Sequence, residues 1–99
     1  MDEQPDPSPK DQEPYESDFL GYIASLGFQA MIFLGEIPNP LTQKSEKNLS
    51  QAKLLIDTLV ILRDKTKGNL DEREKQLLDN SIGELQMRYV AHRQDAKKQ

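Results

Sequence analysis

The sequence predicts an all-α protein: a three-helix domain, made of a helical hairpin and an apolar first helix, after a disordered N-terminal tail. Three segments carry apolar residues at helical spacing, and each follows a residue that can cap a helix N-terminus. Glycine or proline follows the first two segments, where a helix is expected to stop. No segment alternates apolar and polar residues as a strand does. The expected boundaries are a tail over 1–17, a helical domain over 18–95 and a frayed C-terminus over 96–99.

Composition and charge narrow the class of protein. The chain has 99 residues, a formal net charge of -4 and no cysteine, which excludes disulfides and thiolate metal sites and favours a cytoplasmic location. Residues 1–18 hold seven acidic side chains and one lysine, whereas residues 19–99 hold ten acidic and twelve basic ones. The tail is also rich in proline and poor in apolar residues. This composition predicts disorder, and it lacks the pattern of a secretory signal.

The first helix is expected to begin at Ser17 or Asp18 and to end near Gly35, a residue suited to a left-handed C-cap. From Phe19 to Gly35 the chain has no charged residue. A helix that is apolar nearly all round must be covered on every side, and a chain of this length has little material for that cover. The segment therefore predicts association. Small residues within it, such as Gly21 and Ser25, favour close helix packing.

The second helix follows a connector in which Pro38 and Pro40 forbid helix. It is expected to begin at Asn48, which with Gln51 matches a capping box, and to run to Gly68. One broad apolar stripe faces the core. Leu54 and Ile61 lie off that stripe and form a second, narrower one.

The third helix is expected to begin at Asp71, with Glu74 completing another capping box, and to fray among residues 93–99. Its apolar residues form a conventional stripe, from Leu78 to Tyr89. This helix needs the least cover from outside the chain.

Two sets of candidate residues follow from these patterns. Asp57 lies inside an apolar run, so its carboxylate needs an ion-pair partner, for which Arg88 or Arg63 could serve, or a solvent-facing position. Asp57 and Arg88 are the candidate buried polar residues. The candidate interface consists of Gly21, Ala24, Ser25, Phe28, Met31, Leu54 and Ile61.

Motifs that carry chemistry are missing from the sequence. His92 is the single histidine, and in a basic terminal turn it is expected to be solvated. No zinc-type ligand set, phosphate-binding loop or serine with a paired base is recognisable. We therefore expect no catalytic residue, no metal ligand and no cofactor, and we do not expect an enzyme.

Four segments together resemble a known bacterial family. They are LGEIPNP at 34–40, NLSQAKLLIDTL at 48–59, KTKGNLDEREKQLL at 65–78 and ELQMRYV at 84–90. In this combination and order the chain resembles the domain of unknown function numbered eighteen forty-four, over nearly all of residues 18–90. The resemblance implies a small helical bacterial protein that often has an acidic, proline-rich extension. It implies no activity, ligand or catalytic residue.

The function expected from the sequence is an oligomerising interaction or assembly module. A homodimer is favoured, and an unknown protein partner is possible. One alternative is a regulator that binds a small ligand or nucleic acid through the loop Glu36–Leu41 or the basic C-terminal end. Another is a peripheral membrane protein that uses the first helix. Nucleic acid and membrane are disfavoured as partners because aromatic residues are few and the uncharged run is shorter than a usual span of about 20 residues.

Overall fold

The computed structural model describes residues 18–98. This part of the chain folds into three helices without a strand: α1 (Phe19–Leu34), α2 (Leu49–Lys65) and α3 (Glu72–Lys98). The expectation of an all-α, three-helix domain is confirmed. The predicted disorder of the tail over 1–17 lies outside the described residues.

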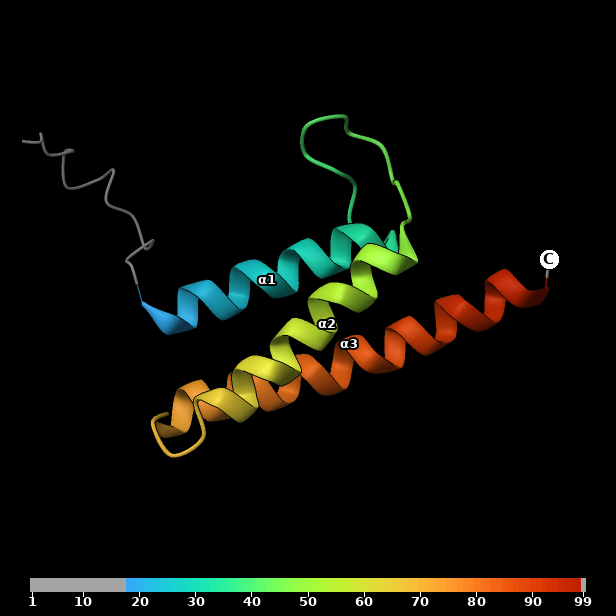
Figure 1. Cartoon of the computed structure of the whole chain (residues 1–99). Coiled ribbons are helices and arrows are strands. Elements are labelled where there is room, and N and C mark those ends of the chain that lie inside the picture. The colour runs from blue at the N-terminus through green and yellow to red at the C-terminus, as the bar shows by residue number, and fades with distance from the viewer. Residues whose placement is uncertain (1–17, 99) are drawn as a thin grey trace, which may run out of the picture.

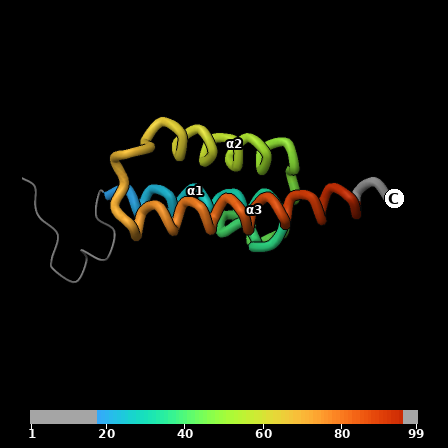
Figure 2. Tube along the Cα trace, turned by 90° about the horizontal axis from the view of Figure 1, so that it is seen from below, coloured from blue at the N-terminus to red at the C-terminus, as the bar shows by residue number. Residues whose placement is uncertain are grey.

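The three helices form two layers. In Figure 1, α1 and α3 run in the same direction, and α2 returns between them across both. Figure 2 shows α2 as one layer and α1 with α3 as the other, and each helix contacts both of the others. Among residues 18–98, no other helix therefore covers the face of α1 that points away from α2 and α3.

The core lies where the three helices meet. Each helix contributes residues three or four positions apart, so that they fall on one face. Partly buried side chains, including Phe19 and Met31 of α1, pack around this centre. The buried residues are Ile23, Leu26, Ala30 and Leu34 of α1, Ala52, Ile56 and Leu59 of α2, and Leu78, Ile82 and Leu85 of α3.

Both ends of α1 agree with the sequence prediction. The Oδ1 atom of Asp18 accepts a hydrogen bond of 2.8 Å from the backbone N–H of Gly21, which satisfies one free donor of the first turn. Gly35 has φ of 85° and donates its N–H to the carbonyl of Ile32 at 3.0 Å. A left-handed residue is therefore what ends the helix.

The ends of α2 depart from the prediction in two ways. Asn48 caps the helix by accepting from the N–H of Gln51, but its own N–H donates to the carbonyl of Phe33 at 2.7 Å, so the reciprocal half of a capping box is not formed. The helix ends at Lys65 instead of continuing to Gly68. The Thr66 hydroxyl donates to the carbonyl of Leu62 at 2.6 Å and closes the last turn. Gly68 has the expected positive φ, 88°, but in the turn beyond the cap.

The start of α3 is the capping box that the sequence predicts. The Asp71 carboxylate accepts from the N–H of Glu74, and the Glu74 carboxylate accepts from the N–H of Asp71, both at 2.9 Å. The helix continues to Lys98, beyond the point where fraying was expected. Neither glycine nor proline occurs after Gly83 to interrupt it.

Candidate functional site

The outward face of α1 carries no charged residue although it is open to water. Tyr22 is 51% exposed and Phe28 is 47% exposed, although both belong to a helix without a charged residue. Gly21, Ala24 and Ser25 are exposed on the same helix. Surface helices of soluble proteins normally turn charged residues toward water. This face does not, so it has the composition of a contact surface.

Gly27 of α1 is not required for close packing against the other described residues. Gly27 lies beside a shallow groove of about 250 Å³ between α1 and α3, lined also by Ala24, Met31 and Leu85. A Cβ atom added at Gly27 would meet no atom within 4 Å. A glycine inside a helix costs about 1 kcal/mol relative to alanine, and no contact with another described residue explains the glycine at this position.

The candidate interface residues fall on two separate surfaces. Met31 is partly buried and packs against the core, whereas the other α1 candidates are exposed. Leu54 and Ile61 are more than half exposed on α2. Because α2 turns Ala52 and Leu59 toward the core, Leu54 and Ile61 point away from α1.

Neither candidate buried polar residue is buried. The side chain of Asp57 is 52% exposed and pairs at 2.8 Å with Lys53, one helical turn earlier, rather than with Arg88 or Arg63. Its place on α2 is close to the outward side that carries Leu54 and Ile61, where water solvates the carboxylate. Arg88 is half-buried and pairs with Glu84 and Glu36. Among the described residues no polar or charged residue is fully buried.

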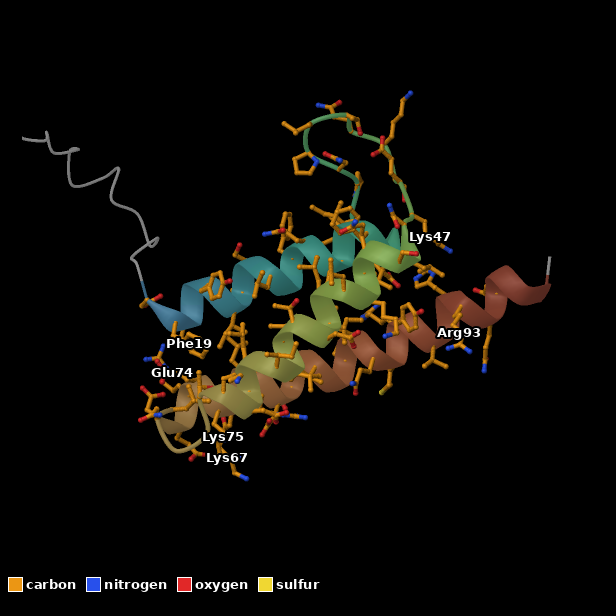
Figure 3. All side chains as sticks on the ribbon, viewed as in Figure 1. Phe19, Lys47, Lys67, Glu74, Lys75 and Arg93 are labelled. Atoms are coloured by element: carbon orange, nitrogen blue, oxygen red, sulfur yellow. The ribbon has the colours of Figure 1, made fainter. Side chains whose placement is uncertain are left out.

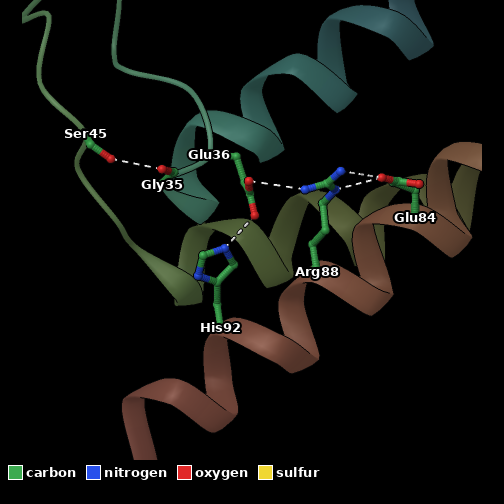
Figure 4. A network of polar contacts seen from close by, with 6 residues as sticks. All are labelled: Gly35, Glu36, Ser45, Glu84, Arg88 and His92. Atoms are coloured by element: carbon green, nitrogen blue, oxygen red, sulfur yellow. Dashed lines mark hydrogen bonds and ion pairs between the residues drawn. The ribbon is translucent and has the colours of Figure 1, made fainter.

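A polar cluster joins the end of α1 to α3 (Figure 4). The Glu36 carboxylate lies 3.2 Å from Nη1 of Arg88 and 2.7 Å from Nε2 of His92. Arg88 also bonds Glu84, one turn earlier on α3, at 2.7 Å. Glu36 thus ties the residue after the α1 cap to two successive turns of α3.

His92 is not solvated as the sequence suggested. Its side chain is only 20% exposed, because the residue after α1 packs over it. An ionised carboxylate only accepts hydrogen bonds. Nε2 of His92 therefore carries a hydrogen and donates the hydrogen bond to Glu36. The hydrogen bond from His92, aided by the charge of Arg88, holds the pKa of Glu36 below its ordinary value, while partial burial opposes the shift. Nδ1 of the same ring is buried and has no hydrogen-bond partner among the described residues. Glu36 binds both His92 and Arg88.

The connector between α1 and α2 is an ordered loop that projects from the domain (Figure 1). The Ser45 hydroxyl donates to the carbonyl of Gly35 at 3.0 Å and closes its base, and the Asn39 side chain accepts from the N–H of Leu41 at 2.8 Å. Gln43 has φ of 60°, which is uncommon outside glycine. The tip presents Leu41, which is 91% exposed.

Another charged region lies at the turn between α2 and α3. A depression of about 360 Å³ is bordered by Arg63, Lys75 and Asp79. Asp79 lies 3.5 Å from Arg63 and 3.2 Å from Lys75, so these charges pair with one another. Within residues 18–98 no three histidine or acidic side chains are grouped so that they could hold a metal ion.

Residues 16–91 match the family described as domain of unknown function (DUF1844), and the chain belongs to this family. No curated protein and no solved structure matches the chain. None of the described helices combines the length and the apolar character needed to cross a membrane.

Sequence reasoning missed the contact between Glu36 and His92. The two residues are 56 positions apart, and neither lies in a pattern that predicts the other. The available signal was an isolated histidine one turn beyond Arg88 on α3. Positions 88 and 92 share a helix face, and two basic groups on one face require an acidic partner when they are partly buried.

Proposed function

We propose that this protein is a self-associating assembly module and that the outward face of α1 is its contact surface. The observation that supports the proposal is the absence of any charge on a helix whose outer half faces water. Burying a large apolar side chain is worth about 1.5–3 kcal/mol. Phe28 and Tyr22, each about half exposed, supply part of this free energy when a partner covers them.

The area of this surface sets the expected affinity of the dimer. Sixteen helical residues extend about 24 Å, and one helix face contributes less area than the roughly 800 Å² per partner of a standard interface. We therefore expect a dimer with a dissociation constant in the micromolar range. A lipid surface fits less well, because helices that lie in a membrane interface usually carry lysine and arginine on their polar side.

The test compares two glutamate substitutions of exposed apolar residues. Phe28→Glu places a charge on the outward face of α1. Met87→Glu places the same charge on α3, where Met87 is 72% exposed and on a different surface. Sedimentation velocity should show a folded monomer for Phe28→Glu and a dimer for Met87→Glu, with circular dichroism confirming equal helix content.

Two results would count against the proposal. If both variants associate like the wild-type protein, the outward face of α1 is not the contact surface. If the wild-type protein is itself a monomer at every concentration, the protein does not self-associate, and a different protein becomes the expected partner of this face.

A further inference from the structure

We infer that two copies associate with their α1 helices antiparallel. The two-fold axis crosses the outward face of α1 at the height along the helix that lies midway between Leu26 and Gly27. This inference rests on the proposed function and specifies the geometry of the dimer. Two independent features of the chain support it: the order of small and large residues along α1, and the distribution of charge between the two ends of the molecule.

The first feature is a stripe along the outward face of α1 that changes from small to large side chains. Gly21, Ser25, Phe28 and Ile32 are spaced by three or four positions and share the side opposite the buried Ile23 and Ala30. Gly21 and Ser25 are exposed and small. Phe28 is exposed and large, and Ile32 is partly exposed and is not among the residues that pack against the core.

An antiparallel pairing makes this stripe complementary to itself. Gly21 and Ile32 are equally far from the midpoint between Leu26 and Gly27, and so are Ser25 and Phe28. In a two-fold arrangement each large side chain therefore faces a small position of the other copy. A parallel pairing would bring Phe28 against Phe28 and leave a gap between the two glycines, which close-packed interfaces avoid.

The second feature is the separation of charge along the molecule. The segment 1–17 has six acidic residues and one lysine, and it joins the domain at the N-terminal end of α1. Residues 88–98 of α3 carry four basic residues and one acidic residue. Figure 3 shows Arg93 and Lys47 at one end of the domain and Phe19, where the tail joins, at the other.

Only the antiparallel arrangement brings these opposite charges together. It brings the N-terminal end of α1, to which the acidic segment is joined, to the end of the other copy where α3 is basic, whereas a parallel arrangement brings like ends together. Attraction between exposed charges is weak and is screened beyond about 10 Å at 0.1 M salt. It selects between two orientations more than it holds the dimer.

The orientation can be tested with engineered cysteines, because the native chain contains none. The full-length variants Gly21→Cys and Ile32→Cys carry tags of different length, so that their cross-linked products differ in mass. The two variants are mixed and oxidised with diamide. In the antiparallel dimer the two cysteines of a mixed pair are opposed. In an antiparallel dimer of two Gly21→Cys chains, the two cysteines are eleven helical positions apart along the helix axis, about 16 Å. A disulfide cannot bridge this distance. The expected product is the mixed cross-link, at least ten times more abundant than either self cross-link.

The outcomes separate this inference from the proposed function. Self cross-linking of each variant without the mixed product would show a parallel dimer, which overturns the orientation but leaves the α1 interface in place. If the proteins sediment as dimers and no cross-link forms, with a second pair from the same stripe, Ser25→Cys and Phe28→Cys, also negative, another face mediates association and both proposals fail. A monomeric wild-type protein would likewise remove the proposed function and this inference with it.

Discussion

The Nε2 atom of His92 lies 2.7 Å from the Glu36 carboxylate and joins the first residue after the α1 cap to the C-terminal half of α3. Arg88 binds the same carboxylate from the preceding turn. These contacts fix the exit of α1 and the base of the loop that follows. They therefore hold the C-terminal end of the proposed α1 interface in place.

Replacing Glu36 with glutamine should destabilise the fold by about 1 kcal/mol. A charged acceptor hydrogen bond is worth about 1.5–3 kcal/mol when buried, and partial exposure reduces this value. Urea unfolding followed by circular dichroism measures the change. Asp95→Asn, an exposed position on the same helix, is the control and should be neutral. Equal stability of Glu36→Gln and wild type would mean that the cluster does not contribute to stability.

The stability contributed by Glu36 should be lost at acidic pH. Its pKa is lower in the folded protein than the ordinary value of 4.5, because His92 and Arg88 favour the ionised form. The contribution is therefore fully present above the unfolded pKa and disappears as the pH falls through the folded pKa. Urea midpoints of wild type and Glu36→Gln should differ at pH 7 and converge as the pH falls below 4.5 and through the folded pKa of Glu36. A constant difference across this range would contradict the assignment.

Two glycines that look alike in the sequence should respond oppositely to alanine. Gly35 has φ of 85°, where a Cβ is strained, so Gly35→Ala should destabilise by about 1 kcal/mol. Gly83 lies inside α3, and an added Cβ there meets no atom within 4 Å. Gly83→Ala should therefore stabilise by up to about 1 kcal/mol. Thermal unfolding of the two variants checks the signs, and the same sign for both would refute the assigned conformations.

Charged substitutions at exposed and at partly buried positions of α1 should have different effects, because the first dissociate the dimer and the second also destabilise the fold. Gly21→Glu lies on the exposed face and should give a folded monomer. Met31→Lys should also lose stability, because Met31 packs against the core. Lys53→Glu, on an exposed part of α2, should change neither association nor helix content. Light scattering and circular dichroism on the same samples distinguish the three results, and a dimeric Gly21→Glu protein would contradict the proposed interface.

Deleting residues 1–17 should leave the helical domain folded and weaken its association at low salt. The segment contributes six of the acidic residues, and the core of the described residues is formed by the three helices. Since charge attraction is screened, the loss of affinity should shrink as the salt concentration rises. Sedimentation of the shortened and full-length chains at two ionic strengths measures both effects. Tighter association after the deletion would show that the tails repel each other.

Local signals in the sequence were sufficient for the three helices. Asp18, Asn48 and Asp71 each cap a helix, because a cap involves only residues three positions apart. The end of α2 was placed too late, since the Thr66 hydroxyl competes for the carbonyls of the last turn before Gly68 is reached. Whether the helix ends at the threonine or at the glycine depends on the backbone conformation of the last turn.

Relations between distant residues could not be predicted in the same way. The pairing of Glu36 with His92 depends on how α1 and α3 lie against each other, and the sequence pattern of one helix does not fix that. The apolar sequence neighbours of Asp57 suggest that its side chain is buried. On a helix, however, adjacent residues point in different directions, and Asp57 lies on the solvent side with Lys53.

Sedimentation equilibrium of the unmodified protein, from low to high micromolar concentration, tests the central claim most directly. If the uncharged face of α1 mediates self-association, the average mass should rise from that of one chain, 11.3 kDa, toward twice that value. The data should fit a monomer–dimer equilibrium with a micromolar dissociation constant. A mass that stays at that of one chain up to high micromolar concentration would contradict the account.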